Sequence, residues 1–101
     1  MRQKFGIIKK INKINIKKVP KDQPVVYGIF TNSGKLQKVG RAKKSRAQKR
    51  IRESAEEIKN VKRQANKFAI IITKTVDDAK KLETKLINKR KPPFNKEKKG
   101  K

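Results

Sequence analysis

The stretch that most restricts what this chain can fold into is residues 75–95, TVDDAKKLETKLINKRKPPFN. Thr75, followed three residues later by Asp78, is typical of a helix N-cap, and acidic residues in a first turn suit the positive end of the helix dipole. An apolar stripe then recurs at helical spacing, formed by Ala79, Leu82, Leu86 and Ile87. Because the residue before a proline is kept out of the helical region, we predict an amphipathic helix that ends before Pro92.

One acidic residue, Glu83, falls inside this apolar stripe, four residues after Ala79 and four before Ile87. A carboxylate on the buried face of a helix loses its hydration and therefore needs a partner. Two interpretations are open at this point. Glu83 either belongs to a functional site or forms a structural ion pair with one of the many Lys and Arg side chains.

The charge balance indicates an anionic partner. The chain of 101 residues carries 32 Lys and Arg against 8 Asp and Glu, a formal net charge of +24, and only 33% of its residues are hydrophobic. Such a chain attracts polyanions, so nucleic acid is the expected partner, with an affinity that falls steeply with salt. An anionic membrane surface is the other candidate. Of the two we expect nucleic acid and no membrane partner. The sequence has no transmembrane or signal-peptide pattern, so we expect no secretion and a location in the cytoplasm or on the nucleoid.

Two missing residue types limit the available chemistry. The absence of Cys excludes disulfides and cysteine-based zinc sites. The absence of His removes the commonest general base and any histidine-dependent nuclease site. A catalytic site must therefore use Tyr, Lys, Arg, Asp, Glu or a metal ion. Tyr27 is the one tyrosine, so any tyrosine-dependent step depends on it.

Residues 24–40 predict a β-hairpin. Two runs rich in β-forming residues, VVYGIF and KLQKVG, flank the turn cluster TNSG. With a connection at residues 31–34, Tyr27 would lie directly opposite Lys38 on one face of the sheet. Gly40, at the end of the second run, is typical of a place where a backbone or ligand comes close. The alternative for Tyr27 is an ordinary core aromatic with a polar tip.

The following segments predict a helix and a strand. Ser45 with Gln48 is typical of a capping box, and the helix that it opens would carry Arg50 on the flank of its buried stripe. The run KFAIIIT, residues 67–73, is apolar throughout, as expected of a strand covered on both faces.

These elements predict a fold of the α/β (α+β) class, with a small three-stranded antiparallel sheet flanked by helices. We expect residues 23–95 to form the domain, with a basic tail at residues 96–101. Residues 1–22 are a basic extension whose isoleucine spacing fits either a helix or a strand added to the core. A solvated basic arm is the alternative for that extension.

The order of elements and several residues resemble the GIY-YIG nuclease domain. That family has two short motifs on a hairpin, a helix with an arginine, a later helix with a glutamate, and an asparagine after a proline. Residues 25–27 (VVY) stand at the first motif, residues 38–40 (KVG) at the second, and Arg50 on the first helix. The run LETKLINKRKPPFN, residues 82–95, is similar to the family's Leu-Glu-x-x-Leu-Ile run that ends in Pro-x-x-Asn.

Three departures from the family pattern bear on activity. Val25 replaces the glycine of the first motif, and Lys38 replaces the tyrosine of the second. The interval from Gly40 to Arg50 is slightly long, which leaves Arg46 as an alternative for the family arginine.

The resemblance implies hydrolysis of DNA phosphodiester bonds with one Mg²⁺ or Mn²⁺ ion. Glu83 would be the metal ligand, Arg50 would clamp a phosphate oxygen, and Asn95 would brace the site. Tyr27 would activate the attacking water. A phenol ordinarily loses its proton only near pH 10, so a nearby cation such as Lys38 would help, or would take over the role of the missing tyrosine.

Residues at and after the second motif are expected to contact nucleic acid: Gly40, Arg41, Lys43, Lys44 and Arg46. The alternative function is a GIY-YIG-like protein that binds nucleic acid without cutting it, and a third is a basic RNA-binding protein of unrelated fold. DNA is the expected substrate, with RNA also open. Phosphate contacts position a protein without reading sequence, so specificity would come from DNA structure, a homodimer or a partner protein.

Overall fold

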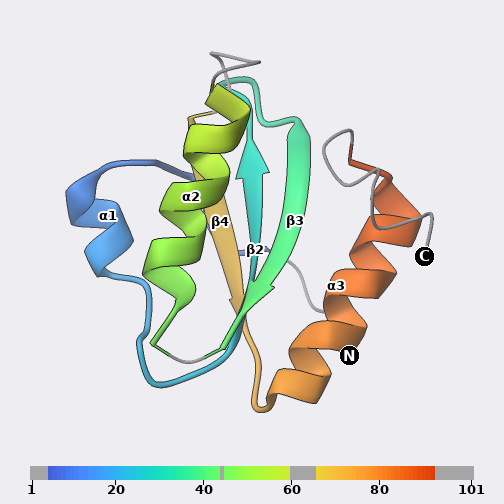
Figure 1. Cartoon of the computed structure of the whole chain (residues 1–101). Coiled ribbons are helices and arrows are strands. Elements are labelled where there is room, and N and C mark those ends of the chain that lie inside the picture. Colours follow the sequence, from blue (N-terminus) through green and yellow to red (C-terminus); the bar gives the residue numbers. More distant parts are fainter. Residues whose placement is uncertain (1–4, 44, 60–65, 93–101) are drawn as a thin grey trace.

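The computed structural model describes residues 5–43, 45–59 and 66–92. Its elements are, in chain order, β1 (Lys9–Lys10), α1 (Lys13–Lys17), β2 (Val25–Phe30), β3 (Leu36–Ala42), α2 (Ala47–Lys59), β4 (Lys67–Ile72) and α3 (Val76–Arg90). The strands form one antiparallel sheet in the order β1-β4-β2-β3, and Figure 1 shows β4, β2 and β3 side by side. The predicted fold class is confirmed, although the sheet has four strands where the sequence predicted three.

Strand β2 is the centre of the sheet, with β3 on one side and β4 on the other. All six of its residues are buried, because helices cover both faces. Alternation along the strand sends Tyr27 and Ile29 to one face and Val26 to the other. This double burial explains why β2 is apolar along its whole length instead of alternating with polar residues.

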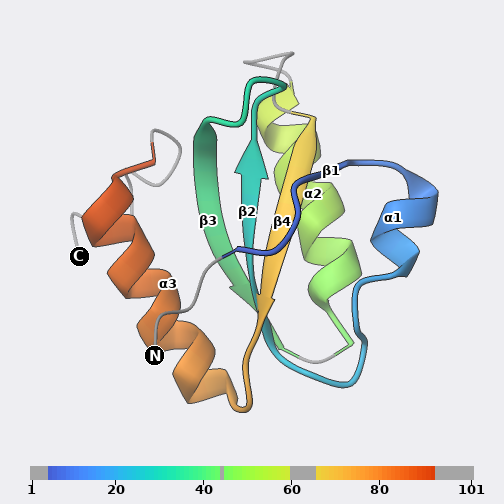
Figure 2. The ribbon, with the colours of Figure 1, turned by 180° about the vertical axis from the view of Figure 1, so that it is seen from behind.

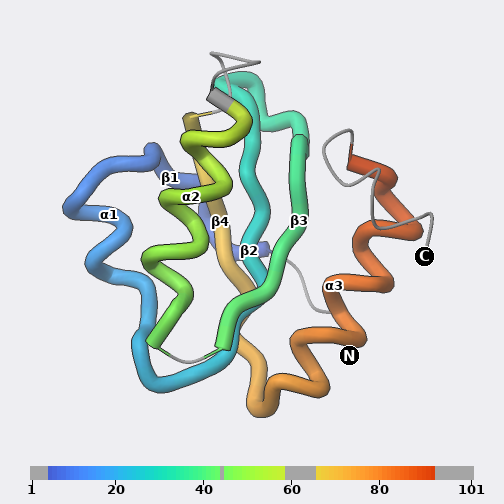
Figure 3. The backbone as a smooth tube through the Cα atoms, viewed as in Figure 1, coloured from blue at the N-terminus to red at the C-terminus, as the bar shows by residue number. Residues whose placement is uncertain are grey.

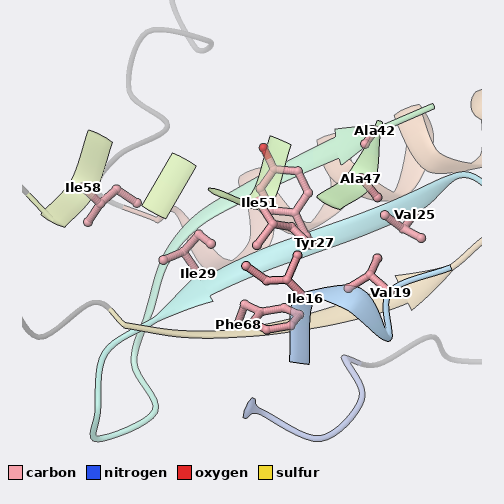
Figure 4. Packing of buried hydrophobic residues seen from close by; sticks show 10 residues of the cluster. All are labelled: Ile16, Val19, Val25, Tyr27, Ile29, Ala42, Ala47, Ile51, Ile58 and Phe68. Carbon is pink, nitrogen blue, oxygen red and sulfur yellow. The ribbon is translucent and has the colours of Figure 1, made fainter. Parts of the chain in front are cut away.

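Two hydrophobic clusters lie on opposite faces of the sheet. The cluster beneath α2 and α1 contains Ile16, Val19, Val25, Tyr27, Ile29, Ala42, Ala47, Ile51, Ile58 and Phe68 (Figure 4). The cluster beneath α3 contains Val26, Val39, Ile71, Ala79 and Ile87. The sheet is therefore the middle layer of three, and β3 forms its outer edge on the side between α2 and α3 (Figure 3).

Helix α3 has the predicted N-cap, the predicted end before Pro92 and the predicted buried carboxylate. The Thr75 hydroxyl accepts a hydrogen bond of 3.0 Å from the Asp78 backbone N–H. Lys91, in the left-handed conformation at φ 46°, closes the helix with a bond of 2.8 Å to the Ile87 carbonyl. Glu83 is buried, with 3% of its surface exposed.

No helix of the described residues is long and apolar enough to cross a membrane.

The N-terminal segment lies along the outer edge of β4 (Figure 2). Its backbone bonds run from Gly6 N to Ile70 O at 3.0 Å and from Ile11 N to Asn66 O at 2.8 Å, on either side of the short β1 pairing. Helix α1 follows and buries Ile16. For residues 5–19 the solvated-arm alternative is therefore wrong, and the segment covers a strand edge that would otherwise be open.

The hairpin register differs from the sequence prediction. The connection is longer than predicted, since Thr31 N donates to Lys35 O at 2.9 Å and β3 begins at Leu36. A further irregularity between Ile29 and Phe30 adds one residue to β3. Both changes shift the pairing in the same direction, so Tyr27 lies opposite Gly40 and Lys38 lies opposite Ile29. The prediction that Tyr27 directly faces Lys38 is wrong.

The start of α2 also differs from the prediction. Ser45 has φ 71°, in the left-handed region, whereas an N-cap residue is normally extended. The first helical bond runs from Arg50 N to Arg46 O at 3.0 Å, so the helix begins at Ala47. The side-chain amide of Gln48 instead donates to Val19 O at 3.0 Å and ties α2 to the N-terminal segment.

The first testable consequence concerns Gly40. A Cβ atom at this position would clash with the Tyr27 ring carbons and hydroxyl oxygen, because the ring lies directly over the β3 backbone. We expect Gly40→Ala to lower the free energy of unfolding by about 1–3 kcal/mol, as overpacking does in other cores. Urea unfolding of the parent and the variant measures this change in the free energy of unfolding.

Gly6→Ala is the matched control, since its added Cβ would meet only Ile70 O at 3.5 Å, an ordinary contact. Replacing the ring with the smaller valine side chain in Tyr27→Val should remove most of the stability loss that Gly40→Ala causes. An equal loss of stability in the Gly6 and Gly40 variants would contradict the close approach.

Candidate active site along the β3 edge

Two consecutive residues of the edge strand β3, Gly40 and Arg41, connect the two faces of the sheet. Gly40 lies under the Tyr27 ring on the face covered by α2. Arg41 donates to Glu83 of α3 on the opposite face. Tyr27 and Glu83 therefore lie on different faces of the sheet, and the edge strand is what both contact.

Tyr27 is 2% exposed and packs in the cluster beneath α2, next to Ile51 in Figure 4. Its hydroxyl lies 2.8 Å from the Ser54 hydroxyl of α2, so either oxygen can donate to the other. Sequence analysis did not single out Ser54. The signal was present, since Ser54 falls three residues after Ile51 and is a polar residue within the buried stripe of α2.

Lys38 lies on the same sheet face as Tyr27, one diagonal step along β3. Its ammonium group forms an ion pair of 3.0 Å with Glu57 of α2. The Lys38 side chain is 21% exposed and that of Glu57 is 70% exposed. Such an exposed pair contributes at most about 1 kcal/mol to stability, so its main effect is to hold the ammonium group between β3 and α2.

Arg50 is exposed on α2, four residues before Ser54. Residues four apart in a helix are neighbours on its surface. Arg50 therefore flanks the bond between Ser54 and Tyr27, on the strip of α2 that continues to Glu57. Arg46, the alternative arginine, is exposed one turn earlier, at the end of the loop from β3.

The Glu83 carboxylate is held by Arg41. Arg41 Nη1 lies 2.7 Å from Glu83 Oε1, a charge-assisted hydrogen bond. Only 4% of the Glu83 side chain is exposed, against 35% of the Arg41 side chain. Arg41 is thus a cation that compensates the burial of Glu83, and its own side chain is partly exposed.

The remaining predicted contacts lie close to this edge or outside the described residues. Lys43 is exposed directly after β3. Lys44 and Asn95 are outside the described residues, so the predicted bracing role of Asn95 stays a prediction.

Glu83 also provides the chemistry expected of a divalent-metal ligand. A carboxylate oxygen suits Mg²⁺ and Mn²⁺, and Mg²⁺ is commonly bound by one or two carboxylates with water and substrate phosphate as the other ligands. Among the described residues no group of three or more acidic, His or Cys side chains could enclose a metal ion. A metal ion held by a single carboxylate such as that of Glu83 would leave most of its coordination positions to water and phosphate.

The side chains of the candidate site meet at strand β3 of a three-layer α+β domain. The family model of the UvrC-like GIY-YIG domain matches residues 23–96, and the chain belongs to this family. The comparisons found no match among curated proteins or solved structures. Family membership excludes the alternative of a basic RNA-binding protein of unrelated fold.

The contact between Tyr27 and Ser54 generates the second prediction. Ser54→Ala leaves the buried Tyr27 hydroxyl without this partner, and Tyr27→Phe does the same to Ser54. We expect each single change to cost about 1–3 kcal/mol of unfolding free energy. The double variant should cost clearly less than the sum, because both polar groups are then gone. Denaturant unfolding of the four proteins measures the coupling, and strictly additive losses would show that the hydroxyls do not interact.

Proposed function

We propose that the chain is an endonuclease that hydrolyses DNA phosphodiester bonds with one Mg²⁺ or Mn²⁺ ion, at a site along the β3 edge of residues 23–95. The observation that supports it most is the buried Glu83 carboxylate, which is held by Arg41. Arg41 directly follows Gly40, the residue beneath the Tyr27 ring. A metal-dependent catalytic domain needs a metal ligand in a fixed position, and in a GIY-YIG domain Glu83 would have this role.

Tyr27 is the group that activates the attacking water in this proposal. Its hydroxyl shares a hydrogen bond with Ser54, which fixes the direction of the phenol oxygen. The ring stays in place because β3 has no side chain at Gly40 beneath it. Ser54 acts here as a positioning residue.

Arg50 and Lys38 supply the positive charge on the α2 side of the edge. Arg50 is exposed and bears a planar, permanently charged guanidinium, which suits a non-bridging phosphate oxygen. Lys38 stands where the family has its second tyrosine, and Glu57 holds its ammonium group in place. In this role Lys38 orients a water or phosphate oxygen.

Glu83 would hold the metal ion on the α3 side of the same edge. A divalent ion bound there would stabilise the charge that develops on the scissile phosphate and the leaving oxygen. Glu83 supplies one anionic oxygen ligand, and water and phosphate oxygens would fill the other positions.

Affinity for DNA would come from the large excess of positive charge. Lys43 and Arg46 are exposed in or beside the connection from β3 to α2 and would contact the phosphate backbone. Such contacts release counterions, so binding should weaken as salt is raised. Because they carry little sequence information, we expect low sequence specificity for the isolated chain.

Plasmid nicking at low salt with Mg²⁺ or Mn²⁺ tests the proposed activity. We expect the parent to convert supercoiled plasmid to the nicked form. Glu83→Gln and Tyr27→Phe should each lower the rate by about 10²–10⁴-fold, since each removes a group that acts on the reacting phosphate or water. Circular dichroism of each variant shows whether the fold is kept.

Glu56→Gln is the matched control, because Glu56 is exposed on α2 and has no proposed role. It should cleave like the parent. Binding of plasmid without cleavage in either metal, by parent and variants alike, would overturn the nuclease and leave a nucleic-acid-binding domain. The same assay on RNA separates the two substrate classes.

The proposed role of Lys38 gives a separate prediction. Lys38→Ala should lower the nicking rate by about 10²-fold, the usual effect of removing one preorganised donor, with a small effect on stability. Lys35→Ala is the control, because Lys35 is an exposed lysine of the same hairpin. Unchanged cleavage by Lys38→Ala would remove Lys38 from the mechanism and leave the rest of the proposal standing.

A further inference from the structure

If the Glu83 carboxylate binds a metal ion, it interacts with two cations, the metal ion and the Arg41 guanidinium. Arg41 Nη1 already contacts Glu83 Oε1 at 2.7 Å. Only 4% of the Glu83 side chain is exposed. A divalent ion and a guanidinium on the same small carboxylate would repel each other at short range, where little water screens them. The two partners therefore compete for the negative charge of the carboxylate, and bound metal weakens its attraction for Arg41.

Arg41 has the properties of a partner that can leave. Its side chain is 35% exposed, so Arg41 lies partly at the surface while Nη1 holds Glu83. It lies on the edge strand β3, whose outer side pairs with no other strand among the described residues. A phosphate oxygen offers the guanidinium the same charge-assisted geometry as a carboxylate oxygen does.

We propose that Arg41 is an exchangeable partner of Glu83, which blocks the carboxylate in the free protein and moves to a phosphate when nucleic acid binds. The exchange leaves both anions paired: the carboxylate passes from the guanidinium to the metal ion, and the phosphate receives the guanidinium. Metal and nucleic acid therefore bind cooperatively. The inference rests on the proposed function for the location of the metal and adds a regulation that this function does not require.

Cooperativity of this kind is reciprocal. If bound nucleic acid raises the affinity for metal by some factor, metal must raise the affinity for nucleic acid by the same factor. Couplings between sites are typically about 5–150-fold. In the free protein the carboxylate stays paired with Arg41, so metal binding without nucleic acid is weak and the site is assembled only on the substrate.

Binding of Mn²⁺, followed by calorimetry or by the signal of the free ion, tests the exchange. It is measured for the full chain alone and with a short nuclease-resistant phosphorothioate duplex, after subtraction of the Mn²⁺ that the duplex binds by itself. We expect the duplex to tighten Mn²⁺ binding by the parent by about 5–150-fold. Glu83→Gln should abolish this tight binding.

Arg41→Gln is the decisive variant. Without the guanidinium, Mn²⁺ should bind the free protein several-fold more tightly than it binds the parent, and the duplex should add little. Arg52→Gln is the matched control, because Arg52 is an exposed arginine of α2 and its loss reproduces the change in overall charge. It should behave like the parent. Equal Mn²⁺ affinity of the Arg41→Gln and Arg52→Gln variants, or no effect of the duplex on the parent, overturns the exchange.

Loss of Arg41 leaves a buried carboxylate without this partner, so the thermal unfolding midpoint is measured on every variant. Arg41→Gln should melt below the parent without metal and recover more than the parent does on addition of Mn²⁺. Where Arg41→Gln does not fold, Arg41→Lys replaces it, with Arg52→Lys as its control. Lysine lacks the planar fork of arginine and should hold Glu83 less well, so the Mn²⁺ affinity of free Arg41→Lys should exceed that of Arg52→Lys. Its failure to do so overturns the proposal.

The outcome is separable from that of the proposed function. Coupled binding of Mn²⁺ and duplex without plasmid nicking would support the exchange and refute the nuclease. Nicking that depends on Glu83, together with a Mn²⁺ affinity that does not change when Arg41 is replaced, would support the nuclease and refute the exchange.

Discussion

The pairing register of β2 with β3 is the constraint on which the rest of the site depends. Side chains alternate between the two faces of a strand, so a slip of one residue would move every β3 side chain to the other face. In the observed register Gly40 lies beneath the Tyr27 ring. The next residue, Arg41, then faces α3 and meets Glu83. The same contact that accommodates the tyrosine thus directs the arginine to the carboxylate, and one strand organises both halves of the candidate site.

The two buried polar contacts are costly for a chain of this size. A domain of about 100 residues buries a limited apolar area, and taking a charge or hydroxyl out of water opposes folding unless it is paired. Glu83 and Tyr27 are 3% and 2% exposed, and their partners Arg41 and Ser54 come from segments far away in the sequence. Apolar residues at these positions would fill the same space without needing partners.

The sequence carried enough information for α3 and for the burial of Glu83, because helical periodicity and capping are local properties. It did not carry the hairpin register, which depends on a longer connection and an irregularity in β3 that the turn residues alone do not reveal. The start of α2 was misjudged for a related reason: Gln48 contacts Val19, a partner from the distant N-terminal segment. The partner of Glu83 was equally hidden, since any of 32 Lys and Arg residues was available to it. Local pattern thus identified the buried carboxylate, and only the tertiary fold identified Arg41.

The acidic residues near the candidate site are few, but two of them orient cations of strand β3. Eight acidic residues cannot neutralise 32 cations, so most of the positive charge remains available to a polyanion. The two ion pairs found in the described part of the chain both involve a cation of β3, Lys38 toward α2 and Arg41 toward α3. Glu57 and Glu83 therefore draw one edge-strand cation to each side of the same strand. A phosphate backbone that approached this edge would meet both cations already oriented, and could compete with each carboxylate for its cation. The pair with the exposed Glu57 would exchange at little cost, whereas the pair with the buried Glu83 would exchange only if another cation took the place of Arg41.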